Sequence, residues 1–83
     1  MLNFGEALNT MRNGECVCRS GWNGKGMFLF LIPSGWEFTC DIEGIEESIT
    51  EPFICMKTAQ GNLIPWLASQ ADILANDWEA VQP

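Results

Sequence analysis

Seven residues in the first third of the chain combine the groups that bind a small polar ligand. The stretch contains three glycines, one indole and one of only four basic residues. Glycine lets backbone N–H groups approach an anion closely, lysine adds positive charge, and an indole stacks on a base. The pattern predicts a phosphate-and-base site, while Asn23-Gly24 is equally a strong signal for a plain hairpin turn. The candidate residues are Trp22, Asn23, Gly24, Lys25, Gly26 and Met27, preceded by Gly21.

A second candidate half-site lies near the C-terminal end, where another indole stands just before a helix start. Ser69 is a typical N-cap, and a helix N-terminus offers unpaired N–H donors to an anion. We expect Trp22 and Trp66 to sandwich a base. Two alternatives stay open: both indoles pack in the core, and Asp72 merely caps its own helix. The candidate residues of this half-site are Pro65, Trp66, Ser69, Gln70 and Asp72.

The residue types argue against catalysis. The chain has no histidine, no G-x-S-x-G elbow and no phosphate-loop motif, so the usual acid, base and nucleophile pairings are missing. Five carboxylates gather between residues 41 and 52 without a basic neighbour. This stretch is typical of an exposed excursion. We expect a non-enzymatic protein without a cofactor; the five acidic residues are Asp41, Glu43, Glu46, Glu47 and Glu51.

Composition limits the partners. Eleven acidic and four basic residues give a net charge of −7, which repels nucleic-acid polymers and anionic membranes, so an anionic ligand must be small and locally held. An 83-residue domain has a thin core, yet 47% of this chain is hydrophobic, which favours self-association. We assign Trp36 and Trp78 to core or subunit contacts. The chain has neither a signal-peptide pattern nor an apolar run of membrane-spanning length, so we expect a cytosolic protein.

The four cysteines fit a reducing compartment. Cys16 and Cys18 are two apart on an expected strand and therefore point to the same face, which is poor geometry for a disulfide between them. Cys40 and Cys55 are isolated, and no C-x-x-C motif occurs. We expect buried reduced thiols, with a four-thiolate zinc site or a disulfide as the alternatives.

Periodicity and capping signals place the first half of the fold. Asn3 and Glu6 form a capping-box pattern at the start of a helix over residues 4–13, which Gly14 ends. Strands are expected at 15–19 and 27–32, joined as a hairpin. The second of these is apolar on both faces, so one face can pack on the helix and a partner subunit is the expected cover for the other.

The second half reads as short strands around one helix. Strands are expected at 36–41, 53–58 and 62–66, the last two as a hairpin. Ser69 begins a short helix with Ile73 and Leu74 facing inward, ended by Asn76-Asp77. Residues 78–81 form an edge strand or an extended tail. The predicted fold is one α+β domain over residues 1–83, a small antiparallel sheet with an N-terminal and a short C-terminal helix, assembling as a homo-oligomer.

Four segments together resemble the second family of Thoeris anti-defence proteins, which are small phage proteins. The two tryptophan motifs occur in the family's order, and Asp77-Trp78 closes the pattern, so the likeness covers both ends and most of the middle. The chain departs from the family in the acidic stretch 41–52 and in its scarcity of basic residues. The segments that carry the resemblance are 3–8, 19–27, 56–59 and 65–78.

The resemblance implies a sponge rather than an enzyme. Members of this family bind the cyclic ADP-ribose isomer made by bacterial TIR-domain sensors and hold it uncleaved, so that the Thoeris effector is not activated. They are homotetramers with ligand pockets between protomers, and some also capture cyclic dinucleotides of CBASS immunity at a separate site. The alternative is a non-enzymatic phage assembly factor or protein inhibitor that uses its acidic face against a basic partner.

Overall fold

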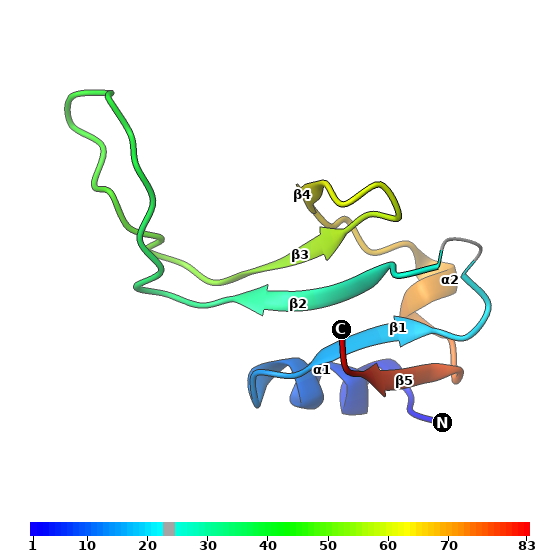
Figure 1. Ribbon diagram of the computed structural model, residues 1–83. Helices are drawn as coiled ribbons and strands as arrows, with labels where there is room; N and C mark the ends of the chain where they lie inside the picture. The colour runs from blue at the N-terminus through cyan, green and yellow to red at the C-terminus, as the bar shows by residue number, and fades with distance from the viewer. Residues whose placement is uncertain (23–24) are drawn as a thin grey trace.

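The structure is a computed structural model that describes residues 1–22 and 25–83. A five-stranded antiparallel sheet has the order β4-β3-β2-β1-β5, and one helix packs beneath β1, β2 and β5 (Figure 1). The expected α+β class with two helices and a small antiparallel sheet is confirmed. The elements are α1 (Phe4–Arg12), β1 (Cys16–Arg19), β2 (Phe28–Ile32), β3 (Phe53–Lys57), β4 (Leu63–Pro65), α2 (Gln70–Ile73) and β5 (Trp78–Val81).

Both ends of α1 follow from its sequence. The Asn3 side chain accepts from the Glu6 N–H at 2.8 Å, and the Glu6 carboxylate accepts from the Asn3 N–H at 3.0 Å. Arg12 lies in the last turn, where its charge suits the helix dipole, and Gly14 follows with φ +86°. The predicted capping box and glycine stop are therefore confirmed.

The register divides the sheet into two faces. Val17 pairs with Leu29 across β1 and β2, and both side chains are buried against Ala7 and Met11 of α1. The alternate residues point to the opposite face, which no helix of the described residues covers; we call it the open face. It carries Cys16 and Cys18 from β1, Phe28, Phe30 and Ile32 from β2, Phe53, Cys55 and Lys57 from β3, and Glu79 and Val81 from β5.

An aromatic cluster closes the core beside α1. Trp78 is fully buried, and the rings of Phe4, Trp22 and Trp66 lie 5.5, 5.4 and 6.1 Å from its ring centre. Its indole N–H donates to the backbone oxygen of Asp72 at 2.9 Å, so its one polar atom is satisfied. The assignment of Trp78 to the core is confirmed.

Residues 33–52 form an arm that projects from the end of β2 and β3, drawn in green in Figure 1. The strand predicted at 36–41 is wrong: one isolated bridge joins Glu37 to Ser48, supported by a 2.7 Å bond from the Ile49 N–H to the Trp36 oxygen. A two-stranded ribbon with no further layer to pack on does not extend its ladder. The expectation of an exposed acidic excursion is correct, and we call residues 33–52 the acidic arm.

The prediction for α2 is wrong in two respects. The helix ends at Ile73, before Asn76-Asp77, and Ile73 and Leu74 are 44% and 74% exposed instead of facing inward. A single helical turn here is held by polar contacts of Ser69 and Asp72, so it needs no apolar face. The edge strand expected at 78–81 is confirmed as β5, paired with β1.

All four cysteines are free thiols, but only Cys55 is buried, so the expected burial fails for the other three. Cys16 and Cys18 do share one face, as their spacing predicts. Neither helix of the described residues is long and apolar enough to cross a membrane. The hairpin turn expected at Asn23-Gly24 lies outside the described residues, although β1 and β2 do pair in antiparallel fashion.

Candidate functional site

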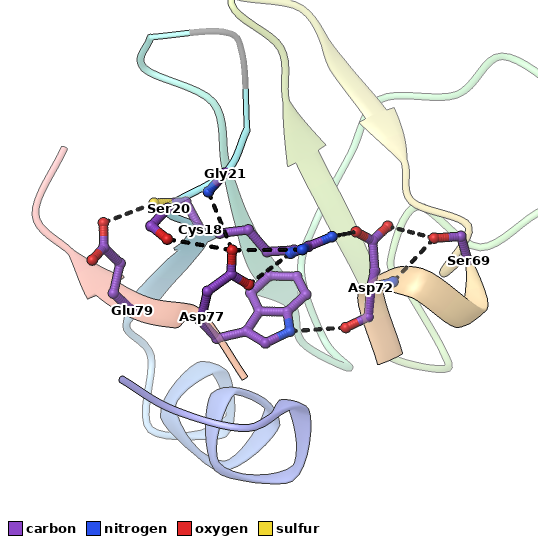
Figure 2. Close-up of polar contacts among 9 residues, drawn as sticks. Cys18, Ser20, Gly21, Ser69, Asp72, Asp77 and Glu79 are labelled. Carbon is purple, nitrogen blue, oxygen red and sulfur yellow. Dashed lines mark hydrogen bonds and ion pairs between the residues drawn. The ribbon is translucent and has the colours of Figure 1, made fainter. Parts of the chain in front are cut away.

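A charged network ties the end of β1 to the C-terminal segment. The Arg19 guanidinium donates to Asp77 at 2.8 Å and to Asp72 at 2.9 Å, so one cation bridges two carboxylates (Figure 2). The hydrogen bonds that Arg19 donates to the Asp77 and Asp72 carboxylates raise its pKa, so it stays charged. The charge of Arg19 is thereby neutralised within its own chain. Arg19 links Asp77, which precedes β5, to Asp72 of α2.

Asp77 also fixes the start of the segment that follows β1. Its Oδ2 accepts from the Gly21 N–H at 3.2 Å and from the Ser20 hydroxyl at 3.3 Å (Figure 2). A Cβ at Gly21 would lie 3.3 Å from the same oxygen, so glycine permits this close approach. The hydrogen bond from Arg19 is the main cause that lowers the pKa of Asp77, assisted by the Gly21 amide.

Asp72 performs two tasks at the start of α2. It accepts from the Ser69 hydroxyl at 2.9 Å, and its backbone N–H donates to that same hydroxyl at 3.1 Å. Burial works to raise the pKa of Asp72, but hydrogen bonds from Arg19 and Ser69 outweigh it, and the net shift is downward. Asp72 therefore caps its own helix and also holds Arg19.

A pocket of about 620 Å³ opens where the segment after β1 meets the open face. The ends of β1, β2 and β3 and the length of β5 supply its walls. The lining mixes polar and apolar side chains. It contains basic residues as well as Trp22, Met27 and Phe28. Its lining residues are Cys18, Arg19, Ser20, Trp22, Lys25, Gly26, Met27, Phe28, Lys57, Glu79, Val81, Gln82 and Pro83.

The structure brings together only the first of the two predicted half-sites. Trp22, Lys25, Gly26 and Met27 line the pocket. Asn23 and Gly24 lie outside the described residues. The second group stands apart from the pocket: Pro65 ends β4, Trp66 joins the aromatic cluster, Ser69 caps α2, Gln70 is exposed at its first position, and Asp72 holds Arg19.

The two indoles expected to sandwich a base pack instead on a third. Trp22 and Trp66 each meet Trp78 edge to face, at 79° and 88° between ring planes. Trp66 is thus a core contact in this structure, which was the alternative left open for it. Trp22 makes two kinds of contact: its ring packs on Trp78, and its side chain also lines the pocket.

Sequence reasoning missed Lys57, Phe28 and Glu79 as pocket residues. Lys57 pairs with Phe28 across β3 and β2, so its ammonium reaches the oxygen of Gly26 at 3.1 Å and lies 5.4 Å from the centre of the Phe28 ring. The alternation along β3 was the available signal, since it places Phe53, Cys55 and Lys57 on one face. Only the strand order shows which neighbour they meet.

Charge is distributed unevenly over the molecule. Six of the eleven carboxylates lie on the acidic arm, which leaves five carboxylates against four cations elsewhere, a net charge of −1. Three of the four cations line the one pocket: Arg19, Lys25 and Lys57. The body therefore does not repel a small anion, although the whole chain is strongly acidic.

The pocket contains polar groups that can bind a ligand. Lys25 and Lys57 offer ammonium groups, and Glu79 offers a carboxylate. Burial and the neighbouring Glu79 carboxylate raise the pKa of the Cys18 thiol, so its reactive thiolate form is disfavoured. The fold and this site define a small α+β domain with a cation-lined pocket at one end of its sheet.

Comparison with known proteins gives the family. Residues 2–81 match the family described as the Thoeris anti-defense 2-like domain. The chain is also similar to Thoeris anti-defense 2 of Bacillus phage SP01, with 45% identity over 84 residues that cover 96% of this chain and 94% of that protein. The chain belongs to the Thoeris anti-defense 2-like family, as its sequence motifs suggest, and this membership supports a phage anti-defence role.

Proposed function

We propose that this protein binds and sequesters, without cleaving it, a small cyclic nucleotide signal of the cyclic ADP-ribose type, and so blocks Thoeris immunity. The observation that carries the proposal is the convergence of three of the four cations on one pocket in a family named for Thoeris anti-defence. A pyrophosphate-bearing nucleotide is a compact anion with an aromatic base. The pocket offers both kinds of partner.

The ligand's groups match the pocket by type. Lys25 and the Gly26 amide are the proposed partners of the phosphate oxygens, and the indole of Trp22 is the proposed platform for the base; all three residues line the pocket. One base–aromatic stack contributes about 1–3 kcal/mol, whereas a nanomolar site needs about 12 kcal/mol. Stacking, phosphate contacts and exclusion of water must therefore combine. Asp72 of α2 supports this site by holding Arg19.

We propose that the protein is not an enzyme. The Cys18 thiol is held in its protonated form, and Asp72 and Asp77 are committed to Arg19, so they are poorly placed as general bases. The test is to incubate the protein with the signal, remove unbound nucleotide by filtration, and denature the protein by heat. Mass spectrometry should then recover the intact cyclic nucleotide; a linear product would identify a hydrolase.

Self-association is part of the proposal. The open face carries Phe28, Phe30 and Ile32 without a covering helix in the described residues, and a second copy of the chain is the proposed cover. The family likeness suggests a homotetramer, whose formal charge would be −28 from four copies at −7 each. The pocket opens on this same face, so a neighbouring protomer would close it.

Two further properties follow the resemblance. Cyclic dinucleotides of CBASS immunity are proposed as a second class of ligand at a separate site, and the cytoplasm of the infected bacterium is the proposed location. Titration with a cyclic dinucleotide in the presence and absence of the cyclic ADP-ribose signal tests the first property. Additive binding supports two sites, and competition supports one.

The acidic arm supports one alternative function. Six carboxylates lie on it beside exposed apolar side chains, among them Trp36 and Ile42, which suits a basic protein partner of an assembly factor or inhibitor. Deleting most of the arm separates the two functions. Sequestration predicts that a shortened chain still retains the nucleotide, and the alternative predicts that it never binds one.

A further inference from the structure

The basic residues of the chain are not equivalent. Arg12 is exposed at the end of α1, away from the pocket, while the other three line the pocket. Arg19 is bound to two carboxylates at 2.8 and 2.9 Å, which engages three of its five N–H donors and offsets its charge. The cations left for an anionic ligand are therefore Lys25 and Lys57.

The Lys57 ammonium has hydrogen-bond donors that it can offer to a ligand. Its ammonium donates to one backbone oxygen, that of Gly26, at 3.1 Å, and a lysine ammonium carries three hydrogens. The ion pairs found in the described residues both belong to Arg19, so no carboxylate there neutralises Lys57. The residue is half-buried, and its ammonium lies over the Phe28 ring, 5.4 Å from the ring centre.

The two lysines approach Gly26 from different elements. Lys25 is the neighbour of Gly26 in the chain, and Lys57 reaches its carbonyl from β3. Gly26 has φ +77°, a left-handed conformation that favours glycine, so the turn that presents its carbonyl to Lys57 depends on this residue. Both lysines therefore line the pocket beside Gly26.

The wall of the pocket formed by β5 is acidic where the wall near Gly26 is basic. Glu79 on β5 is the pocket's acidic residue apart from the network around Arg19, and it accepts weakly from the Cys18 thiol at 3.8 Å. Three strand spacings separate β3 from β5, roughly 14 Å in a regular sheet. The pocket is therefore polarised, with cations at the β2–β3 side and a hydrogen-bond acceptor at the β5 side.

We propose that Lys57 is a second anion-binding residue that acts with Lys25 as a clamp for two adjacent phosphates, while Glu79 accepts from a hydroxyl or amino group at the ligand's other end. The inference rests on the proposed function and narrows it to ligands with a pyrophosphate. A ligand with one phosphate would engage Lys25 and leave Lys57 on the Gly26 oxygen.

The test compares four substitutions in the full chain by calorimetric titration. Lys57→Met removes the charge and keeps the unbranched stem over Phe28, Lys57→Arg keeps the charge, and Arg12→Gln removes one positive charge far from the pocket. The probes are a cyclic ADP-ribose-type nucleotide and inorganic pyrophosphate. Circular dichroism and size exclusion check that each variant folds and assembles, with Lys57→Gln as a second neutral variant.

The inference predicts that Lys57→Met weakens nucleotide binding about ten- to a hundredfold, the usual effect of losing a charge-assisted hydrogen bond. Lys57→Arg should recover much of this loss, and Arg12→Gln should bind like the parent. Nucleotide binding that is unchanged in folded Lys57→Met and Lys57→Gln would overturn the inference and leave the proposed function standing.

Inorganic pyrophosphate separates the two claims. A parent protein that binds pyrophosphate through Lys57 but ignores the cyclic nucleotide would support the clamp and reject the proposed signal. A parent that binds neither probe would reject both. Equal binding of inorganic phosphate and pyrophosphate would also overturn the clamp, because a single lysine would then explain the site.

Discussion

The Arg19 guanidinium lies 2.8 Å from the Asp77 carboxylate, and the same carboxylate accepts from the Gly21 amide at 3.2 Å. One aspartate therefore connects the last residue of β1, the first glycine of the candidate binding segment and the start of β5. The pocket keeps its shape through this contact. Ligand binding and local order should consequently depend on the same few hydrogen bonds.

Asp77→Asn tests this connection. The amide keeps the size of the carboxylate but loses its charge and one acceptor oxygen, so Arg19 and Gly21 can no longer both be satisfied. We expect weaker binding of the cyclic nucleotide with the fold retained, measured by titration calorimetry and circular dichroism. Glu46→Gln makes the same charge change on the acidic arm and should bind like the parent. Equal affinity of the two variants would remove Asp77 from the site.

The same network should make the stability of the fold depend on pH. The pKa values of Asp72 and Asp77 are lowered in the folded protein, so each carboxylate stabilises the fold fully above its unfolded pKa, about 3.9. This contribution is lost as the pH falls through the lower folded pKa values. Urea unfolding followed by tryptophan fluorescence between pH 6 and 2 should show stability falling below about pH 4.

Arg19→Met is the matched variant for that experiment. Without the guanidinium the two carboxylates lose the partner that lowers their pKa values, so the variant should start less stable at pH 6 and lose less on acidification. Parallel stability curves for parent and variant would show that the network does not contribute through these carboxylates.

Trp22→Ala should affect binding and stability together. Loss of a base platform costs about 1–3 kcal/mol of binding free energy, and loss of the edge-to-face contact with Trp78 costs about 0.5–1.5 kcal/mol beyond the buried area. Trp22 lies outside the strands that form the open face, and its ring packs on Trp78 within its own chain, so assembly should persist. Titration, urea unfolding and light scattering measure the three quantities; a variant that binds like the parent would place the base elsewhere.

Trp36→Ala should behave in the opposite way. Trp36 is 45% exposed on the acidic arm, and its ring lies 6.3 Å from that of Phe30 on the open face. We expect weaker self-association at micromolar concentration and little direct effect on the nucleotide. Light scattering across a dilution series gives the result. A parent protein that is monomeric in the same series would contradict self-association itself.

Trp78→Ala should abolish folding under ordinary conditions. Truncating a fully buried tryptophan costs about 3–5 kcal/mol, a large part of the 5–15 kcal/mol typical of a domain, and it also removes one of the donors to the Asp72 backbone oxygen. Trp78→Phe keeps most of the ring volume and should fold with a lower urea midpoint. A midpoint for Trp78→Ala equal to the parent's would show that the aromatic cluster is not the core.

Local signals in the sequence were sufficient where the contacts are local. Asn3 and Glu6 define the start of α1 by hydrogen bonds over three residues, and Ser69 caps α2 in the same way. The pocket depends instead on strand order. Lys57 meets Gly26 because β3 lies beside β2, a pairing between distant segments that no short motif encodes.

The packing of Trp22 and Trp66 on Trp78 was not foreseen for a related reason. Trp78 is separated from Trp22 by 56 positions, and it packs against both Trp22 and Trp66 only because β5 pairs with β1 across the sheet edge. The inward face expected for α2 failed because the helix is a single turn held by Ser69, Asp72 and Arg19. Its polar contacts are again visible only in the folded chain.

Direct titration of the purified protein with the cyclic ADP-ribose signal, followed by heat release and mass spectrometry, tests the central claim most directly. The account predicts saturable binding with a dissociation constant near or below the nanomolar range, about −12 kcal/mol, and recovery of the nucleotide with its mass unchanged. Failure to bind the signal, or release of a linear product, would contradict it.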